Sequence, residues 1–299
     1  MRVGLVAPQL GAFVARAHLI GQSPRPGAGT TAVAQSRSQY AKECSETPDR
    51  LALSLLVTAG WLSLLAATSL TDLGRLDAAS AYLRTAAQLA DEAEHTELRA
   101  WCLETRAWQA LIGSRHQQAA ILARGAQDVA PHGSSAFVQA TAQAGRAWAR
   151  LGAVPETLDA LARVEALVSP MPVPDQPEHH FRYDPGKSEA YVATTLTWLG
   201  DPAAVGVARG VLRRIESGAD GTVRPRRAAT ARLDLALALA AADQVDEAAG
   251  IAQEAIGSGL LVQSHMWRAE EVIAAVGEHD PDGATSLREA KERWCARRH

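Results

Sequence analysis

The sequence predicts an all-α protein, a right-handed α-solenoid of stacked antiparallel helical hairpins, and three observations favour this fold. Of its 299 residues 61 are Ala, the best helix former. No run of β-branched or aromatic residues indicates a strand. A short motif that is typical of a helical hairpin recurs along the chain.

Residues 1–35 come first and are predicted to be poorly structured. The stretch from Gln22 to Thr30 contains two prolines and two glycines, a composition typical of a linker. The helical repeat domain is then expected to cover residues 36–299.

The next segment, from Leu51 to Thr71, carries no charged residue and has about the length that a bilayer requires. Ser and Thr side chains dilute its apolar character, and it runs directly into the first hairpin motif. We therefore expect a buried helix in preference to a membrane span, and no association with a membrane.

The hairpin motif is clearest at Leu73–Ala79, where a helix ends at a small residue, a tight turn follows and a second helix begins with Ala. Three further clear copies and two looser ones follow, and their anchor residues lie 36 to 47 positions apart: Ala79, Ala119, Thr157, Ala204, Ala248 and Ala284. This pattern resembles the tetratricopeptide repeat, two antiparallel helices in about 34 residues. A single hairpin cannot bury its own apolar face, so we expect the hairpins to stack, with their first helices lining a concave surface.

A proline-rich linker at residues 169–178 interrupts the repeats, because alternate prolines exclude a helix. It leads into the polar and aromatic residues His179, His180, Phe181 and Asp184. We expect Asp184 to cap a helix that begins at Pro185, and His180 and Phe181 to dock the linker onto the next hairpin. A ligand site is the alternative, whereas a metal site lacks its third or fourth ligand.

Polar and aromatic residues at helical spacing lie on the predicted first helices. Amide groups pair with a peptide backbone, while Arg and Lys hold a carboxylate, so these residues form a candidate ligand-binding groove. Its members are Glu104, Trp108, Gln139, Gln143, Arg146, Lys187, Tyr191 and Thr194. An ordinary solvated helix face, with the tryptophans packed between helices, is the alternative.

Catalytic motifs are missing from the sequence. It contains no GxSxG, HExxH or P-loop string, and we predict no enzyme, no cofactor and no metal. Three widely spaced cysteines favour a reducing cytoplasm. The net charge of −3, from 30 basic and 33 acidic residues, argues against a chain that binds nucleic acid unaided.

Four strings carry a closer resemblance: Glu104–Trp108, Val129–His132, Arg146–Gly152 and His179–Lys187. Over about residues 40–295 the chain resembles the C-terminal tetratricopeptide-like region of actinobacterial XRE-type helix-turn-helix transcriptional regulators. The resemblance implies a DNA-binding domain in front of this region, but the N-terminal residues offer no helix-turn-helix pattern. We expect DNA contact only through a missing or separate domain.

The function predicted from these features is a regulatory module that senses a peptide or small-molecule effector, or binds a partner protein. The resemblance implies a homodimer, and the apolar Leu51–Thr71 segment is the candidate interface. A constitutive protein-interaction scaffold without ligand switching is the alternative.

Overall fold

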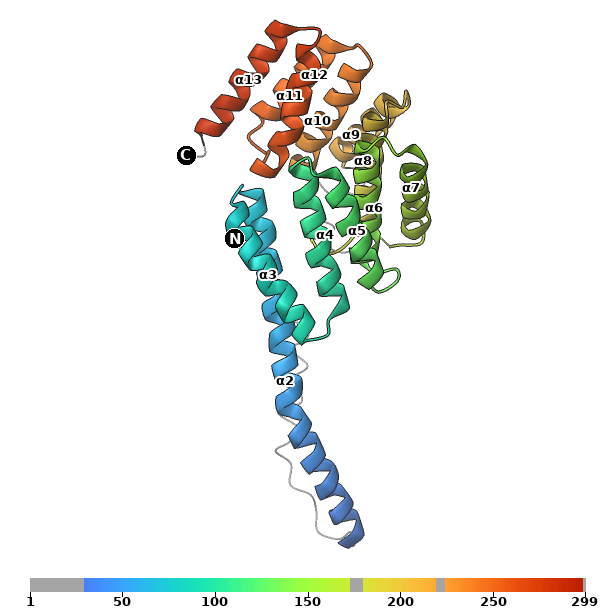
Figure 1. Ribbon diagram of the computed structural model, residues 1–299, viewed down its shortest axis with the longest axis vertical. Helices are drawn as coiled ribbons and strands as arrows, with labels where there is room; N and C mark the ends of the chain where they lie inside the picture. Colours follow the sequence, from blue (N-terminus) through green and yellow to red (C-terminus); the bar gives the residue numbers. More distant parts are fainter. Residues whose placement is uncertain (1–29, 173–179, 219–223, 298–299) are drawn as a thin grey trace. The chain divides into compact units, whose positions relative to one another are not determined.

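A computed structural model describes residues 30–172, 180–218 and 224–297, with side chains from Arg50 onward. Over these residues the chain forms twelve α-helices and no strand, which confirms the all-α class (Figure 1). Residues 1–52 and 53–299 form two compact units.

The helices pair into six consecutive hairpins, with one short 3-10 helix, η1 (Gln263–His265), before the last pair. The hairpins are α2 (Thr30–Asp72) with α3 (Leu76–Glu92), α4 (Thr96–Ile112) with α5 (His116–Val129), α6 (Ser135–Arg150) with α7 (Val154–Val168), α8 (Pro185–Leu199) with α9 (Ala204–Ser217), α10 (Pro225–Ala241) with α11 (Val245–Gly257), and α12 (Met266–Gly277) with α13 (Pro281–Ala296). Each hairpin packs against the next along the chain, so the predicted repeat architecture is confirmed.

All six anchor residues are buried, and each lies within the first four residues of the second helix of its hairpin. The two looser copies of the motif are therefore true hairpins. Several turns between paired helices contain a left-handed residue, among them Gly74 (φ +74°), Gly152 (φ +69°) and a strained Asp243 (φ +58°).

Small side chains set the distance between the helices. Ala107, Ala123 and Ala144 come from three consecutive helices and meet in one buried cluster. A Cβ atom on Gly60 would lie 2.5 Å from Cδ2 of Leu98, so α2 and α4 touch where Gly60 has no side chain. The abundance of Ala is thus explained by close helix packing as well as by helix propensity.

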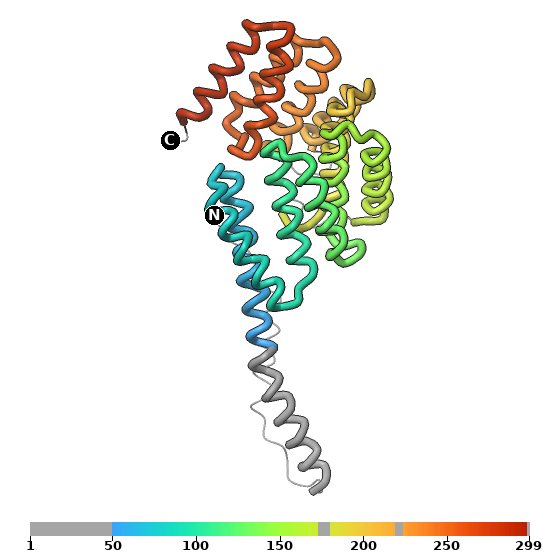
Figure 2. The backbone as a smooth tube through the Cα atoms, in the orientation of Figure 1, coloured from blue at the N-terminus to red at the C-terminus, as the bar shows by residue number. Residues whose placement is uncertain are grey.

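The first and last hairpins of the second unit also touch. The buried hydroxyl of Ser264, in η1, donates a hydrogen bond of 2.5 Å to Oδ1 of Asp72 at the end of α2. Burial raises the pKa of Asp72, and the Ser264 hydrogen bond partly opposes this rise. In Figure 2 the tube shows the turn between α2 and α3 beside the segment that precedes α12.

The Leu51–Thr71 segment corrects one prediction. Its helix is buried on one side only, where Leu64 and Ala67 join the core formed with α3, α4 and α6. The exposed large side chains are Leu51, Leu53, Leu55, Leu62 and Leu65, which are 37 to 61% accessible. Within the described residues, Arg50–Asp72 is one helix that is long and apolar enough to cross a membrane by length and composition alone.

The two segments predicted to lack helix are only partly described. Residues 1–29 lie outside the described residues, whereas Thr30 already belongs to α2, so residues 30–35 are helical contrary to the prediction. Of the proline-rich linker, residues 169–172 follow the end of α7 without helix, and 173–179 lie outside the described residues.

We predict that Ala123→Leu lowers the free energy of unfolding by about 1–3 kcal/mol, because the added methyl groups have no space between α4, α5 and α6. Urea denaturation measures the change. Ala78→Leu on the exposed face of α3 is the control and should change stability by less than about 0.5 kcal/mol. Equal effects of the two substitutions would show that helix spacing does not depend on Ala123.

Candidate functional site

The first helices of consecutive hairpins lie side by side. Helix α4 contacts α6, α6 contacts α8, α8 contacts α10 and α10 contacts α12. Their shared face carries a set of polar side chains that we call the polar row: Glu104, Gln139, Gln143, Arg146, Tyr191, Asp234 and Arg268. Every one of them is buried or half-buried, so this face is not an ordinary solvated helix surface.

At one end of the polar row, three helices meet through Gln139. Its Nε2 atom donates to Oε1 of Glu104 and to the hydroxyl of Tyr191, at 3.1 Å each. Burial raises the pKa of Glu104 to about 7, and the hydrogen bond from Gln139 and the charge of Arg146 only partly oppose this rise. Glu104 therefore changes protonation state near neutral pH.

Arg146 occupies the middle of the polar row and is 3% exposed. Its Nη1 atom donates to Oε1 of Gln143 at 3.2 Å, and its guanidinium lies over the ring of Tyr191 at 4.9 Å and that of Trp198 at 5.5 Å. Its Nε atom and the Nε2 atom of Gln143 are buried and have no hydrogen-bond partner within the part of the chain that the structure describes. Burial, followed by the nearby charge of Arg268, lowers the pKa of Arg146 to about 10, so the side chain is still protonated at neutral pH.

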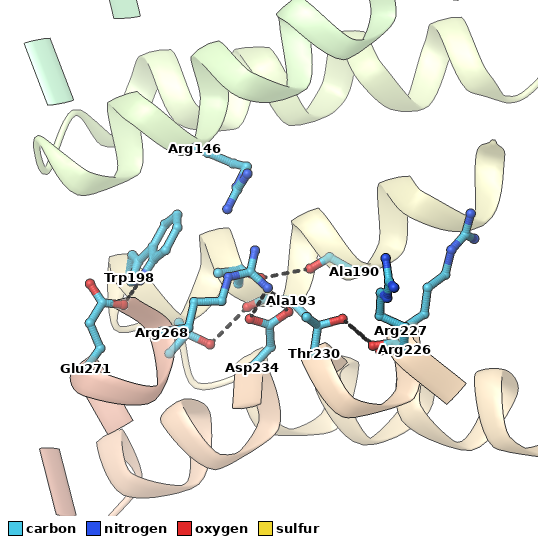
Figure 3. Close-up of polar contacts among 12 residues, drawn as sticks. Arg146, Ala190, Ala193, Trp198, Arg226, Arg227, Thr230, Asp234, Arg268 and Glu271 are labelled. Carbon is cyan, nitrogen blue, oxygen red and sulfur yellow. Dashed lines mark hydrogen bonds and ion pairs between the residues drawn. The ribbon is translucent and has the colours of Figure 1, made fainter. Parts of the chain in front are cut away.

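The next two members, Asp234 and Arg268, form a buried ion pair with Nη1 and Oδ1 3.0 Å apart. Burial raises the pKa of Asp234, with Arg268 the main opposing influence. Figure 3 shows Arg146 extending from α6 toward the helices that carry this pair. Because Arg268 already holds Asp234, no carboxylate among the described residues is bonded to Arg146.

Beside the polar row lies an open cavity of about 430 Å³. Trp198, Leu237 and Ala240 contribute apolar walls, while Arg150 and Glu271 face it as an ion pair with Nη1 and Oε1 2.5 Å apart. Trp198 Nε1 also donates to Oε2 of Glu271 at 3.4 Å, as drawn in Figure 3. The Trp198 ring lines the cavity on one side and contacts Arg146 as well as Arg150. The volume is in the range of small-molecule sites.

The structure brings five of the predicted groove residues together: Glu104, Gln139, Gln143, Arg146 and Tyr191. Lys187 is half-buried and its charge reaches Glu104, while the buried hydroxyl of Thr194 donates to the carbonyl of Ala190 in its own helix. Trp108 instead lies 6.4 Å from the ring of His180.

Sequence reasoning missed Asp234, Arg268, Arg150 and Glu271. Their partners are far apart along the chain, and no fixed spacing connects them. Asp234 alone gave a signal, because it is a lone acid within the apolar run from Leu233 to Ala242. An acid in such a run is either exposed or paired inside the fold, and here it is paired.

The cap predicted after the proline-rich linker is confirmed. Asp184 Oδ1 accepts from the backbone N–H of Gly186 at 3.0 Å, at the start of α8, where Pro185 is the first helical residue. Its other oxygen, Oδ2, lies 2.5 Å from Nη1 of Arg227 on α10. His179 lies outside the described residues.

The predicted docking of His180 and Phe181 onto the next hairpin is wrong. Phe181 lies against Trp61 and Trp101, at ring distances of 5.3 and 5.4 Å, and His180 lies 6.4 Å from Trp101. These tryptophans belong to α2 and α4, in earlier hairpins. Phe181 packs against the core cluster that contains Trp101, and a hydrogen bond from the Tyr183 N–H to Ser135 holds the segment at the start of α6.

Comparison with known proteins finds no match among protein-family models and no significant match among curated proteins. The resemblance to XRE-type regulators therefore stays a prediction. Among the described residues, no three His, Cys, Asp or Glu side chains are grouped as metal ligands.

We predict that Glu104→Gln makes the protein more stable at pH 8 by about 1–3 kcal/mol and leaves it nearly unchanged at pH 4.5. The folded protein keeps a proton on Glu104 that the unfolded chain releases above pH 4.5, so wild-type stability falls as pH rises from 4.5 to about 7. The amide cannot ionise and still accepts from Gln139.

Urea denaturation from pH 4.5 to 8 measures this difference. The exposed Glu92→Gln at the end of α3 is the control and should follow the wild-type curve. Parallel curves for wild type and Glu104→Gln would contradict the assigned burial of the carboxyl group.

Proposed function

We propose that the chain is a regulatory module that binds a small-molecule or peptide effector, or a partner protein, on the face formed by its first helices. It acts with a helix-turn-helix DNA-binding domain outside this chain, and as a homodimer. The association with such a domain rests on the resemblance quoted above.

The observation that carries the effector site is the cavity of about 430 Å³ beside the polar row. Its walls come from α6, α8, α10 and α12, which belong to four different hairpins. A ligand there contacts all four helices at once, so its binding free energy depends on how these hairpins are oriented. This dependence supports a switching function over a constitutive scaffold.

The homodimer is supported by the exposed leucines of α2. Leu55 and Leu62 are seven residues apart, Leu65 follows three later, and all three are 37 to 61% exposed. This is the spacing at which two helices pack along one seam. An exposed apolar face of this kind fits coverage by a second copy.

We predict that a small-molecule or short-peptide library contains compounds that raise Tm, and that Ala274→Phe removes the effect by filling the cavity. Small-angle scattering with and without such a compound then measures the change in radius of gyration. Binding with no change in scattering favours the constitutive scaffold. Hits that survive Ala274→Phe would place the effector site elsewhere.

We predict that the double variant Leu55→Glu with Leu62→Glu is a folded monomer, because charges cannot be buried without partners in an apolar interface. Light scattering measures the mass and circular dichroism the helix content. Leu158→Glu on α7, where the leucine is 50% exposed, is the control and should leave the dimer intact. A dimer that persists in the double variant excludes this face.

A further inference from the structure

We propose that the cavity beside the polar row takes a ligand with an apolar body and a single carboxylate, and that Arg146 is the residue that binds the carboxylate. The proposal rests on the proposed function and names the chemical class of the effector. A free organic acid and the C-terminus of a peptide share this chemistry.

The charge balance around Arg146 favours an anion. Arg268 is held by Asp234 and Arg150 by Glu271, so each of these cations already has its carboxylate. Glu104, whose charge also acts on Arg146, has a pKa of about 7 and is bonded to Gln139 rather than to Arg146. One buried positive charge is therefore left without a full counter-charge, and burying such a charge is costly.

The unused donors of this pair fit a carboxylate. Nη1 of Arg146 is occupied by Gln143, but Nε–H has no partner in the protein, and it belongs to the edge of the guanidinium that binds a carboxylate with two parallel hydrogen bonds. The Nε2 group of Gln143 is a second buried donor without a partner. Both groups are hydrogen-bond donors, so both fit a ligand group that only accepts, such as a carboxylate.

Trp198 connects this pair to the cavity. Its ring is half-buried, lines the cavity and lies 5.5 Å from the Arg146 guanidinium. Arg146 does not itself line the cavity, so the proposal requires the Trp198 ring to turn aside and admit the carboxylate to Nε of Arg146. The apolar side of the ligand would lie against Trp198, Leu237 and Ala240.

A single carboxylate fits better than a phosphate or an amine. Only one cation of the polar row lacks a bonded carboxylate, whereas a phosphate dianion would require two. Acidic residues at the mouth of the cavity, such as Asp243 with 87% of its side chain exposed, attract amines. Their field is screened by water and salt, while that of the buried Arg146 is not.

The test compares three small molecules that share one apolar body: 4-phenylbutyrate, its neutral amide and the cation 4-phenylbutylamine. It also compares the tripeptide Ala-Ala-Leu with a free C-terminus and the same tripeptide with an amidated C-terminus. Isothermal calorimetry measures affinity. We expect the two acids to bind at least tenfold more tightly than their amides. Which acid binds more tightly distinguishes a small organic acid from a peptide C-terminus.

Two variants locate the carboxylate. Arg146→Met should weaken binding of the acids at least tenfold, yet the ligand-free variant should melt at the same temperature as wild type or higher, since an uncompensated buried charge is gone. A merely structural arginine would instead lower Tm. Arg124→Met, on the exposed face of α5, is the control for the loss of an arginine and should bind as wild type does.

If Arg146→Met does not fold, the comparison of acids with amides on the wild-type protein still tests whether the site prefers a carboxylate. Acids that bind no better than amides, or binding of the acids that Arg146→Met leaves unchanged, would overturn the assignment. If the amine or the amide binds as tightly as the acids, and Ala274→Phe abolishes that binding, the assignment of a carboxylate ligand is wrong but the effector site stays in place. If no compound of the small-molecule and short-peptide library binds and none of these probes binds, the proposed effector-binding function is itself rejected.

Discussion

The close approach of helices at small side chains is the constraint on which the rest of the second unit depends. Ala107, Ala123 and Ala144 let three helices meet, and the missing side chain of Gly60 lets α2 reach Leu98. Helices that lie this close leave little room for water between them. Polar side chains on their shared face are therefore desolvated, which is why Glu104 keeps its proton up to a pKa of about 7.

Desolvation makes the charges of the polar row depend on one another. Asp234 and Arg268 hold each other, and Arg150 with Glu271 repeats the arrangement at the cavity. Arg146 lies between these pairs and has the faces of Tyr191 and Trp198 in place of a carboxylate. Cation–π contacts offset only part of the cost of burying a guanidinium. The row thus combines satisfied ion pairs with one cation that an additional anion would satisfy.

The sequence was sufficient for the fold because hairpin turns and small anchors are local signals. Gly74 and Ala79 mark one hairpin within a few residues, and the same signal holds at Asp243 and Ala248. The groove was predictable in part, since Gln139, Gln143 and Arg146 share one helix face. The ion pairs were not, because Asp234 and Arg268 are brought together by stacking that no spacing encodes. The apolar Leu51–Thr71 segment was predictable as a candidate interface, but how much of it the core covers was not, because only the packing shows which side of a helix is buried.

The contact that joins the first and last hairpins bears on how an effector would act. A hydrogen bond from Ser264 to Asp72 connects the end of α2 with the segment before α12, and α12 carries both Arg268 and Glu271. A ligand that shifts α12 relative to α6 and α8 would therefore strain this bond as well. Asp72 is half-buried and accepts directly from the buried Ser264 hydroxyl, so breaking this bond would leave a buried donor without its partner. The helix that carries the exposed leucines would in this way sense the state of a site carried by hairpins later in the chain, which is the coupling between two sites that allostery requires.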